Sequence, residues 1–179
     1  MESVPPISLE QLANSLSKKK RPTQFYSYAE LPENPQDLAF LILSNPARFL
    51  FHSASANSDV GHWTAMRRNG RDIYWFSSYG FLPDGELMIS PTLRSAPGQG
   101  QNKIADALEL LRTQGYVIHY SSVPLQNTKN PTTSCGMWCL MFLTAKINNF
   151  EDFEDRLSKI TNPERYAAAI YRKEYGSML

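Results

Sequence analysis

A cysteine preceded by a run of hydroxyl residues is the part of this chain best suited to nucleophilic chemistry. Thr132, Thr133 and Ser134 precede Cys135 in the segment NPTTSCGMWCLMFL, and all three are residue types that cap helix N-termini well. The residues after Cys135 are apolar on every side, which predicts a buried helix that begins at this cysteine. The positive end of a helix dipole and its unpaired N–H groups stabilise a thiolate, so we expect a lowered pKa for the thiol.

The neighbours of Cys135 suit this role and argue against a metal site. Gly136 permits a substrate backbone to approach closely, and Cys139 lies one turn further along the helix among apolar residues, where a thiol is inert. Cys135 and Cys139 would supply only two metal ligands, and His52 and His119 show no paired ligand spacing. We therefore expect neither a metal nor a cofactor.

A histidine opens a second segment of interest, GHWTAMRRNGRDIYWFSSYG at residues 61–80. Asn69 and Gly70 tolerate positive φ, so they predict a two-residue hairpin turn. A loop of these two residues places His62 directly opposite Ser77, within reach of a hydrogen bond or a water bridge. The predicted partner of the imidazole is therefore a hydroxyl where a catalytic histidine commonly has a carboxylate.

Three carboxylates close to these segments in the sequence are alternative partners for the imidazole. Asp59 precedes the hairpin, and Asp84 and Glu86 follow it within a few residues. The sequence does not place their side chains, so a displaced acid stays open as an alternative to Ser77.

The composition indicates one globular domain. The chain has 179 residues, of which 42% are hydrophobic and 12% aromatic, enough for a substantial core. Its net charge is +1, from 18 basic and 17 acidic residues, which argues against a general nucleic-acid coat. The basic run KKKR at 18–21 is expected to be a solvated linker, with a nuclear address or phosphate contact as the alternative.

No segment resembles a membrane span or a secretory leader. The longest apolar stretches, LAFLIL and MWCLMFL, fall well short of the roughly 20 residues that cross a bilayer. The N-terminus lacks a charged region followed by an apolar one, so we expect a protein that is not secreted and whose two cysteines are thiols.

Hydrophobic periodicity and capping residues predict the elements that must position these groups. The expected helices cover 8–17, with Ser8 as the N-cap, 35–45, 102–115, 135–147, 150–160 and 163–175. The expected strands cover 47–54, the two arms of the hairpin, and 116–126. Residues 18–35 and 82–100 are expected to be irregular.

The order of these motifs resembles a known family. GHW, then FSSYGF, then SSVPLQ before SCGMWCLMFL is similar to the adenain-type cysteine proteases of adenoviruses, polinton-like elements and virophages. These proteases belong to the larger clan of SUMO and ubiquitin-like proteases, and the resemblance covers roughly residues 45–146. It implies an α+β fold with a central, mostly antiparallel sheet packed against a buried helix that carries the nucleophilic cysteine at its N-terminus. The chain would then be a single cysteine-protease domain over 1–179, with an N-terminal arm over 1–35.

The resemblance also implies roles for individual residues. Cys135 falls on the nucleophile, His62 on the general base, and Trp63 on the tryptophan that follows this base. Trp63 and Gly136 would border a narrow substrate groove beside the cysteine helix. Ser77 falls on the position of the acid, which agrees with the hairpin register, and a neutral group suffices there because papain-like enzymes use Asn.

The resemblance places the oxyanion-hole glutamine at Gln126. Its side-chain amide would donate to the developing oxyanion together with the backbone N–H of Cys135. The spacing between Gln126 and Cys135 is longer than is typical of the family, so Asn127 and Asn130 remain alternatives for this role.

The expected function is a cysteine endopeptidase that cleaves viral capsid or core precursors at small, glycine-containing sites during virion maturation. The alternatives are an isopeptidase for ubiquitin-like proteins, or an inactive protease fold that acts as a binding or virion protein. We expect a monomer in the virion or in the host cytoplasm or nucleus, with protein or peptide substrates and neither nucleic acid nor membrane as a partner. The segment GYVIHYSSVPLQ has no cysteine, so the covalent activating peptide of the adenovirus branch has no attachment point there. A non-covalent activating peptide or nucleic-acid cofactor stays open as an alternative.

Overall fold

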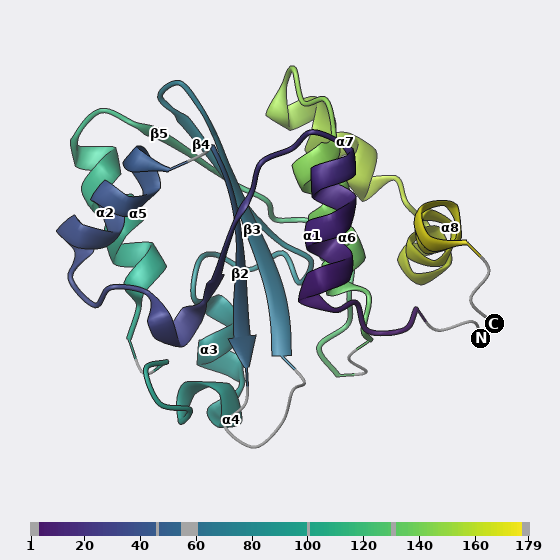
Figure 1. The fold of residues 1–179 in the computed structure, drawn as a ribbon, viewed down its shortest axis with the longest axis horizontal. Coiled ribbons are helices and arrows are strands. Elements are labelled where there is room, and N and C mark those ends of the chain that lie inside the picture. Colours follow the sequence, from purple (N-terminus) through teal and green to yellow (C-terminus); the bar gives the residue numbers. More distant parts are fainter. Residues whose placement is uncertain (1–3, 46, 55–60, 100, 130–131, 177–179) are drawn as a thin grey trace.

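The fold is α+β, with a five-stranded sheet between two groups of helices (Figure 1). The computed structural model describes residues 4–45, 47–54, 61–99, 101–129 and 132–176. The strands are β1 (Gln24–Ser27), β2 (Arg48–Ala54), β3 (Gly61–Asn69), β4 (Asp72–Ser77) and β5 (Val117–Tyr120), in that spatial order. The pairs β2–β3 and β3–β4 are antiparallel, and the outer pairs β1–β2 and β4–β5 are parallel. The sheet is therefore mixed, which corrects the expectation of a mostly antiparallel one.

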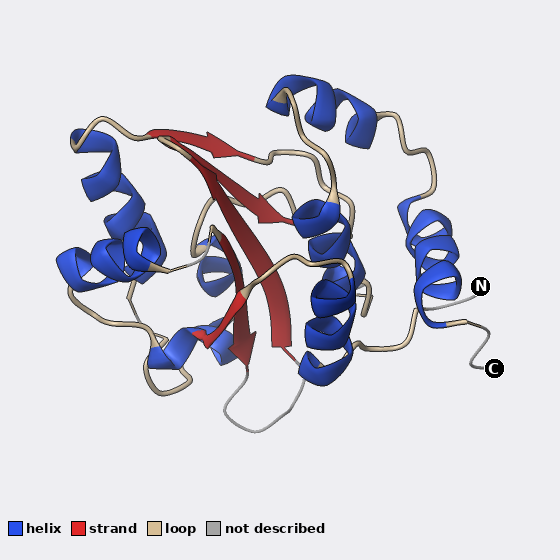
Figure 2. Ribbon diagram, turned by 45° about the horizontal axis from the view of Figure 1, so that its top comes forward, coloured by secondary structure: helices blue, strands red, loops and turns tan. Residues whose placement is uncertain are grey.

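Each face of the sheet is covered by helices that bury their apolar sides against it (Figure 2). On one face lie α2 (Pro35–Ser44), α3 (Gly85–Ile89) and α5 (Lys103–Thr113), and on the other lie α1 (Leu9–Lys18) and α6 (Cys135–Thr144). The remaining elements are η1 (Tyr28–Glu30), α4 (Pro91–Arg94), α7 (Phe150–Ser158) and α8 (Pro163–Tyr175). Helices α7 and α8 contribute buried residues to the same apolar cluster as α6, so α6 is enclosed on all sides.

Local capping groups set the helix ends, at Ser8 as the sequence predicts and at Asn34, which the sequence analysis did not single out. Ser8 and Gln11 form a reciprocal capping box at the start of α1. The side chain of Asn34 accepts the first free N–H groups of α2, whose first residue is Pro35. Gly115 has φ +87° directly after α5, a conformation that glycine adopts without steric cost.

Three segments differ from the sequence-based expectation. Residues 18–35 contain β1 and η1, and residues 82–100 contain α3 and α4, whereas the sequence predicts irregular structure for both. These short elements depend on pairing and packing with distant residues, as in the pairing of β1 with β2, so they leave no periodic pattern of their own. The strand expected over 116–126 is limited to Val117–Tyr120, and the chain beyond it runs as a loop beside the end of β4.

The hairpin forms with a turn one residue later than predicted. Asn69 pairs with Asp72, so the loop is Gly70–Arg71 and the pairing is displaced by two residues from the predicted register. Gly70 has φ +60° whereas Arg71 does not have positive φ, which is the pattern of a type II′ turn, with glycine first. A two-residue displacement leaves every side chain on its original face, so the apolar pattern alone does not distinguish the two registers.

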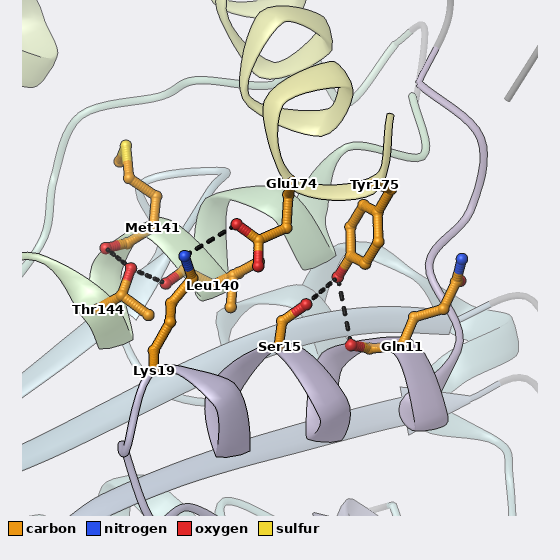
Figure 3. A network of polar contacts seen from close by, with 8 residues as sticks. All are labelled: Gln11, Ser15, Lys19, Leu140, Met141, Thr144, Glu174 and Tyr175. Atoms are coloured by element: carbon orange, nitrogen blue, oxygen red, sulfur yellow. Dashed lines mark hydrogen bonds and ion pairs between the residues drawn. The ribbon is translucent and has the colours of Figure 1, made fainter. Parts of the chain in front are cut away.

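Helix α8 is tied to α1 by polar contacts that close this side of the molecule (Figure 3). The Tyr175 hydroxyl accepts from Ser15 at 3.0 Å and donates to the Gln11 carbonyl at 3.3 Å. Lys19 and Glu174 form an ion pair at 2.9 Å. Across the stretches that the structure describes, no helix combines the length and the apolar character needed to cross a membrane.

Candidate active site

The thiol of Cys135 lies at the first residue of α6 and is almost completely enclosed, with the residue 6% exposed. Backbone N–H groups of Trp63, Gly136 and Cys135 itself face the sulfur and lower its pKa. Burial acts in the opposite direction and is the larger effect, so the pKa of Cys135 is raised above its ordinary value. The sequence-based expectation of a lowered pKa is therefore wrong for this state, because desolvation outweighs the helix N-terminus.

The hydroxyl residues before Cys135 do not cap the helix as their types suggested. Ser134 has helical backbone angles (φ −83°, ψ −4°), and its side chain makes no capping hydrogen bond. Its hydroxyl instead donates to Oε1 of Glu164 at 2.9 Å. The first N–H groups of α6 consequently receive no acceptor from Ser134.

The second cysteine has different surroundings. Cys139 is fully buried in the apolar cluster, as the sequence predicts. Its Sγ donates to the backbone carbonyl of Trp63 at 3.3 Å, and burial raises its pKa well above the ordinary value. These surroundings keep Cys139 a neutral thiol.

The imidazole of His62 is buried, 4% exposed, and held from two sides. Its Nε2 lies 3.3 Å from Oγ of Ser77, and its ring stacks on Tyr79 at a centroid distance of 4.3 Å. Burial and the neighbouring charge of His52 lower the pKa of His62 to about 3. The predicted contact with Ser77 is thus present, although Ser77 pairs with Thr64 and reaches His62 diagonally across the hairpin.

Cys135 and His62 have neighbouring residues in common. The Trp63 amide that faces the sulfur belongs to the residue directly after His62, and Tyr79, which stacks on His62, has its pKa raised in part by Cys135. Within the described residues no hydrogen bond joins the two side chains. With a raised thiol pKa and a lowered imidazole pKa, both groups are neutral in this state.

Gln126 is buried and takes part in a chain of hydrogen bonds with Ser78, Thr132 and Glu164. Its Oε1 accepts from the hydroxyl of Ser78, and its Nε2 donates to the carbonyl and to Oγ1 of Thr132, both at 2.9 Å. Oγ1 of Thr132 donates in turn to Glu164 at 2.7 Å. An oxyanion role for Gln126 therefore requires one of its bonds to Thr132 to give way to substrate.

The alternative residues named from the sequence take other positions. Asp84 accepts from the backbone N–H of Ala105 at 2.7 Å, and Glu86 is buried without a hydrogen-bond partner among the described residues. Burial raises the pKa of Glu86 to about 7, and neither carboxylate bonds to His62. Asn127 accepts from the N–H of Lys129, whereas Asp59 and Asn130 lie outside the described residues.

The N-terminal segment lies across the start of α6. The hydroxyl of Thr133 donates to the carbonyl of Val4. A methyl group placed on Gly136 would lie 3.4 Å from Cβ of Ile7 and 3.5 Å from Cδ1 of Trp63. Val4 and Ile7 are 2% and 6% exposed, so this segment covers the helix turn that contains Cys135.

Sequence reasoning missed three residues of this arrangement. Tyr79 stands in the motif FSSYGF without a role that its type would suggest, and Ile7 belongs to the segment expected to be an arm. Glu164 lies in the first turn of α8, where an acidic residue is ordinary and carries no sign of a distant contact. Among the residues that the structure describes, no three His, Cys, Asp or Glu side chains gather as a metal site would require.

Comparison with known proteins gives a weak similarity to a virophage protein. No protein-family model matches the chain. The chain is 28% identical over 101 residues to a protein of Sputnik virophage named "Uncharacterized protein V9". The match covers 55% of this chain and 56% of that protein, so it spans little more than half of either. The similarity supports a virophage origin and carries no information about a reaction.

Proposed function

We propose that this protein is a cysteine endopeptidase of the adenain type, with Cys135 as the nucleophile and His62 as the general base. The observation that carries the proposal is the position of the Cys135 thiol. It lies at the first residue of a buried helix and is faced by three backbone N–H groups. It shares the neighbour Tyr79 with His62, whose Nε2 lies 3.3 Å from Oγ of Ser77 on β4.

In the proposed mechanism Nδ1 of His62 is the base, and the contact of Nε2 with Ser77 is compatible with this role. When Nε2–H donates to Oγ of Ser77, the lone pair lies on Nδ1, which is free to take the thiol proton. The thiolate then attacks the substrate carbonyl, and the N–H groups at the start of α6 stabilise the oxyanion. The imidazolium returns its proton to the leaving amine, and water hydrolyses the thioester that remains.

Because burial keeps both groups neutral, the proton moves from Cys135 to His62 as the substrate enters rather than before. Substrate must displace part of the apolar cover and supply a carbonyl close to the free N–H groups. The neutral Ser77 offers the imidazolium no full charge, so the protonated state of His62 is short-lived.

The surroundings of Gly136 support cleavage at small residues. A methyl group on Gly136 would already be in van der Waals contact with Trp63 at 3.5 Å, so a small substrate residue fits best beside this glycine. Together with the similarity to a virophage protein, this favours glycine-containing sites in capsid or core precursors as substrates, cleaved in the virion or the infected cell.

A peptide library made from a protein digest tests the activity without a known substrate. Mass spectrometry should find new termini after glycine-containing sites with the wild-type protein and with Cys139→Ala, and none with Cys135→Ala. Cys139→Ala is the matched control because it removes the other buried thiol of the same helix. Loss of cleavage in Cys139→Ala alone, with native folding, would contradict the assignment.

Two further outcomes separate the alternatives. Release of a fluorophore from the C-terminus of a ubiquitin-like protein, without cleavage of the peptide library, would identify an isopeptidase. No turnover in either assay, together with no Cys135-dependent labelling by a thiol-reactive probe, would identify an inactive protease fold that binds proteins.

A further inference from the structure

The carboxylate of Glu164 gathers the two hydroxyl groups that precede the candidate nucleophile. Its Oε1 accepts from Thr132 at 2.7 Å and from Ser134 at 2.9 Å, and these two hydroxyl oxygens lie 3.2 Å apart. Glu164 belongs to the first turn of α8, which is about thirty residues away in the sequence. The last helix of the chain therefore holds the loop that leads into α6.

A carboxylate at this point sets the direction of the whole hydrogen-bond chain. It accepts only, so Thr132 must point its hydroxyl hydrogen at Glu164 and offer its lone pairs to Gln126. Gln126 then donates to Thr132 and accepts from Ser78 at its other end. Glu164 thereby orients the amide of Gln126 through Thr132.

The same carboxylate keeps Ser134 from acting as an ordinary N-cap. A capping serine has an extended backbone and accepts from the second or third N–H of its helix. Ser134 has a helical backbone and donates to Glu164 instead, which leaves the N–H of Gly136 facing the sulfur of Cys135.

We infer that Glu164 is a positioning residue that withholds the Ser134 hydroxyl from α6, so that the first N–H groups of the helix stay available to the Cys135 sulfur and to an oxyanion. This inference rests on the proposed function for its catalytic meaning. The availability of the N–H groups is a property of the thiol site alone and can be measured without a substrate.

Other contacts hold α8 in place, so the role of Glu164 can be separated from docking of the helix. Ala167, Ala168 and Tyr171 of α8 are buried in the cluster around α6. At the far end of α8, Glu174 pairs with Lys19 of α1 (Figure 3). Glu174→Ala is therefore a matched control that removes a carboxylate of the same helix from a different partner.

The test measures the rate at which iodoacetamide alkylates Cys135 in the full chain. Mass spectrometry identifies the alkylated cysteine. The variants compared are Glu164→Ala, Ser134→Ala, the double variant Glu164→Ala/Ser134→Ala, and Glu174→Ala. In Glu164→Ala the freed Ser134 hydroxyl takes the Gly136 N–H, and the rate should be about 10- to 100-fold lower than in the double variant, which lacks the same carboxylate and therefore the same contribution of its charge to the Cys135 pKa. Removing the competing hydroxyl in Glu164→Ala/Ser134→Ala should restore most of the rate. Glu174→Ala should leave the rate at the wild-type value.

Recovery in the double variant is the outcome that a purely structural role would not produce. If Glu164 only anchors the loop, the double variant reacts as slowly as Glu164→Ala or more slowly, and the inference is overturned.

The outcome is independent of the proposed function. If the wild-type protein cleaves no peptide while the alkylation rates follow the expected pattern, the proposed function fails and the positioning role stands. If cleavage occurs but the double variant shows no recovery of alkylation, the proposed function stands and the inference fails.

Discussion

Two adjacent serines at the end of β4 serve different parts of the candidate site. Ser77 contacts His62 and Ser78 donates to Gln126, and both serines are fully buried. Successive residues of a strand point to opposite faces, so a serine pair at a strand end reaches two sets of partners. The dipeptide therefore links the base on one side to the residue proposed for the oxyanion hole on the other.

Ser77→Asp places a carboxylate beside Nε2 of His62 and should raise the pKa of this histidine from its low value of about 3. The chain has three histidines, so the titration of His62 can be followed by NMR. Ser77→Ala, which removes the hydroxyl without adding charge, is the control and should leave the pKa low. An unshifted pKa in Ser77→Asp would show that another group orients the imidazole.

The same variant should change how stability depends on pH. The pKa of His62 is about 3 in the folded state against an ordinary value of 6.5, so the unfolded state binds more protons between these values. The contribution of His62 to stability is therefore present above pH 6.5 and is lost as the pH falls toward 3. If Ser77→Asp raises the folded-state pKa of His62, its free energy of unfolding should change less between pH 7 and pH 5 than that of the wild type. Urea unfolding at the two pH values measures this difference.

At the scale of an element, α6 has two ends with different chemistry. Its N-terminus presents free N–H groups to Cys135, whereas its C-terminal carbonyls accept from arginines of the sheet. Arg67 donates to the carbonyls of Phe142 and Ala145 at 2.9 and 2.7 Å, and Arg48 donates to that of Leu143 at 3.1 Å. Cations at a helix C-terminus interact favourably with the helix dipole. The arginines of β2 and β3 therefore fix the position and the direction of α6 on the sheet.

Arg67→Met should lower the free energy of unfolding by about 2–4 kcal/mol, because two charge-assisted hydrogen bonds to carbonyls at the end of α6 disappear. Arg71→Met is the control, since its side chain is exposed and its bonds to the carbonyls of Gln114 and Gly115 are 3.3 and 3.4 Å long. Urea unfolding measures both variants. Equal losses of stability in the two would show that Arg67 contributes no more to α6 than a surface arginine does.

At the scale of the whole molecule, the start of the chain covers the candidate site. Val4 and Ile7 contact Thr133 and Gly136, the residues on either side of the Ser134–Cys135 pair. Pro5 and Pro6, between the two buried anchors, are exposed and lack the N–H that an extended peptide uses in recognition. Because this segment covers the first turn of α6, it limits access to the thiol until it moves.

Ile7→Ala should increase the rate at which iodoacetamide alkylates Cys135, because it lowers the free energy needed to open the N-terminal segment. Each 1.4 kcal/mol of this decrease should raise the rate about 10-fold. Leu16→Ala is the matched control, because it removes a buried side chain of the same apolar cluster from α1 without uncovering Gly136. The melting temperatures of the two variants show how much each substitution destabilises the fold, so the alkylation rates can be compared at the same distance below each melting temperature. A rate increase of the same size in Leu16→Ala would mean that general loosening, rather than the N-terminal segment, exposes the thiol.

Local chemistry in the sequence determined most of the element ends and the identity of the central residues. Ser8, Asn34 and Gly115 act within a few residues of their own position, so their effect on α1, α2 and α5 can be inferred from neighbours alone. The apolar run from Cys135 to Thr144 predicts a buried helix for the same reason. The nearness of His62 to Ser77 was also within reach, although the turn chosen by Gly70 displaced the register by two residues.

Tertiary structure alone decided the charge state of the site and the partners of its hydroxyl groups. The N–H groups that lower the pKa of Cys135 belong to its own turn and to β3, but the burial that outweighs them comes from packing against distant elements. The diversion of Ser134 from capping requires Glu164, whose helix approaches only in the folded chain. Desolvation and long-range hydrogen bonds depend on what surrounds a residue in space, and no local pattern encodes them.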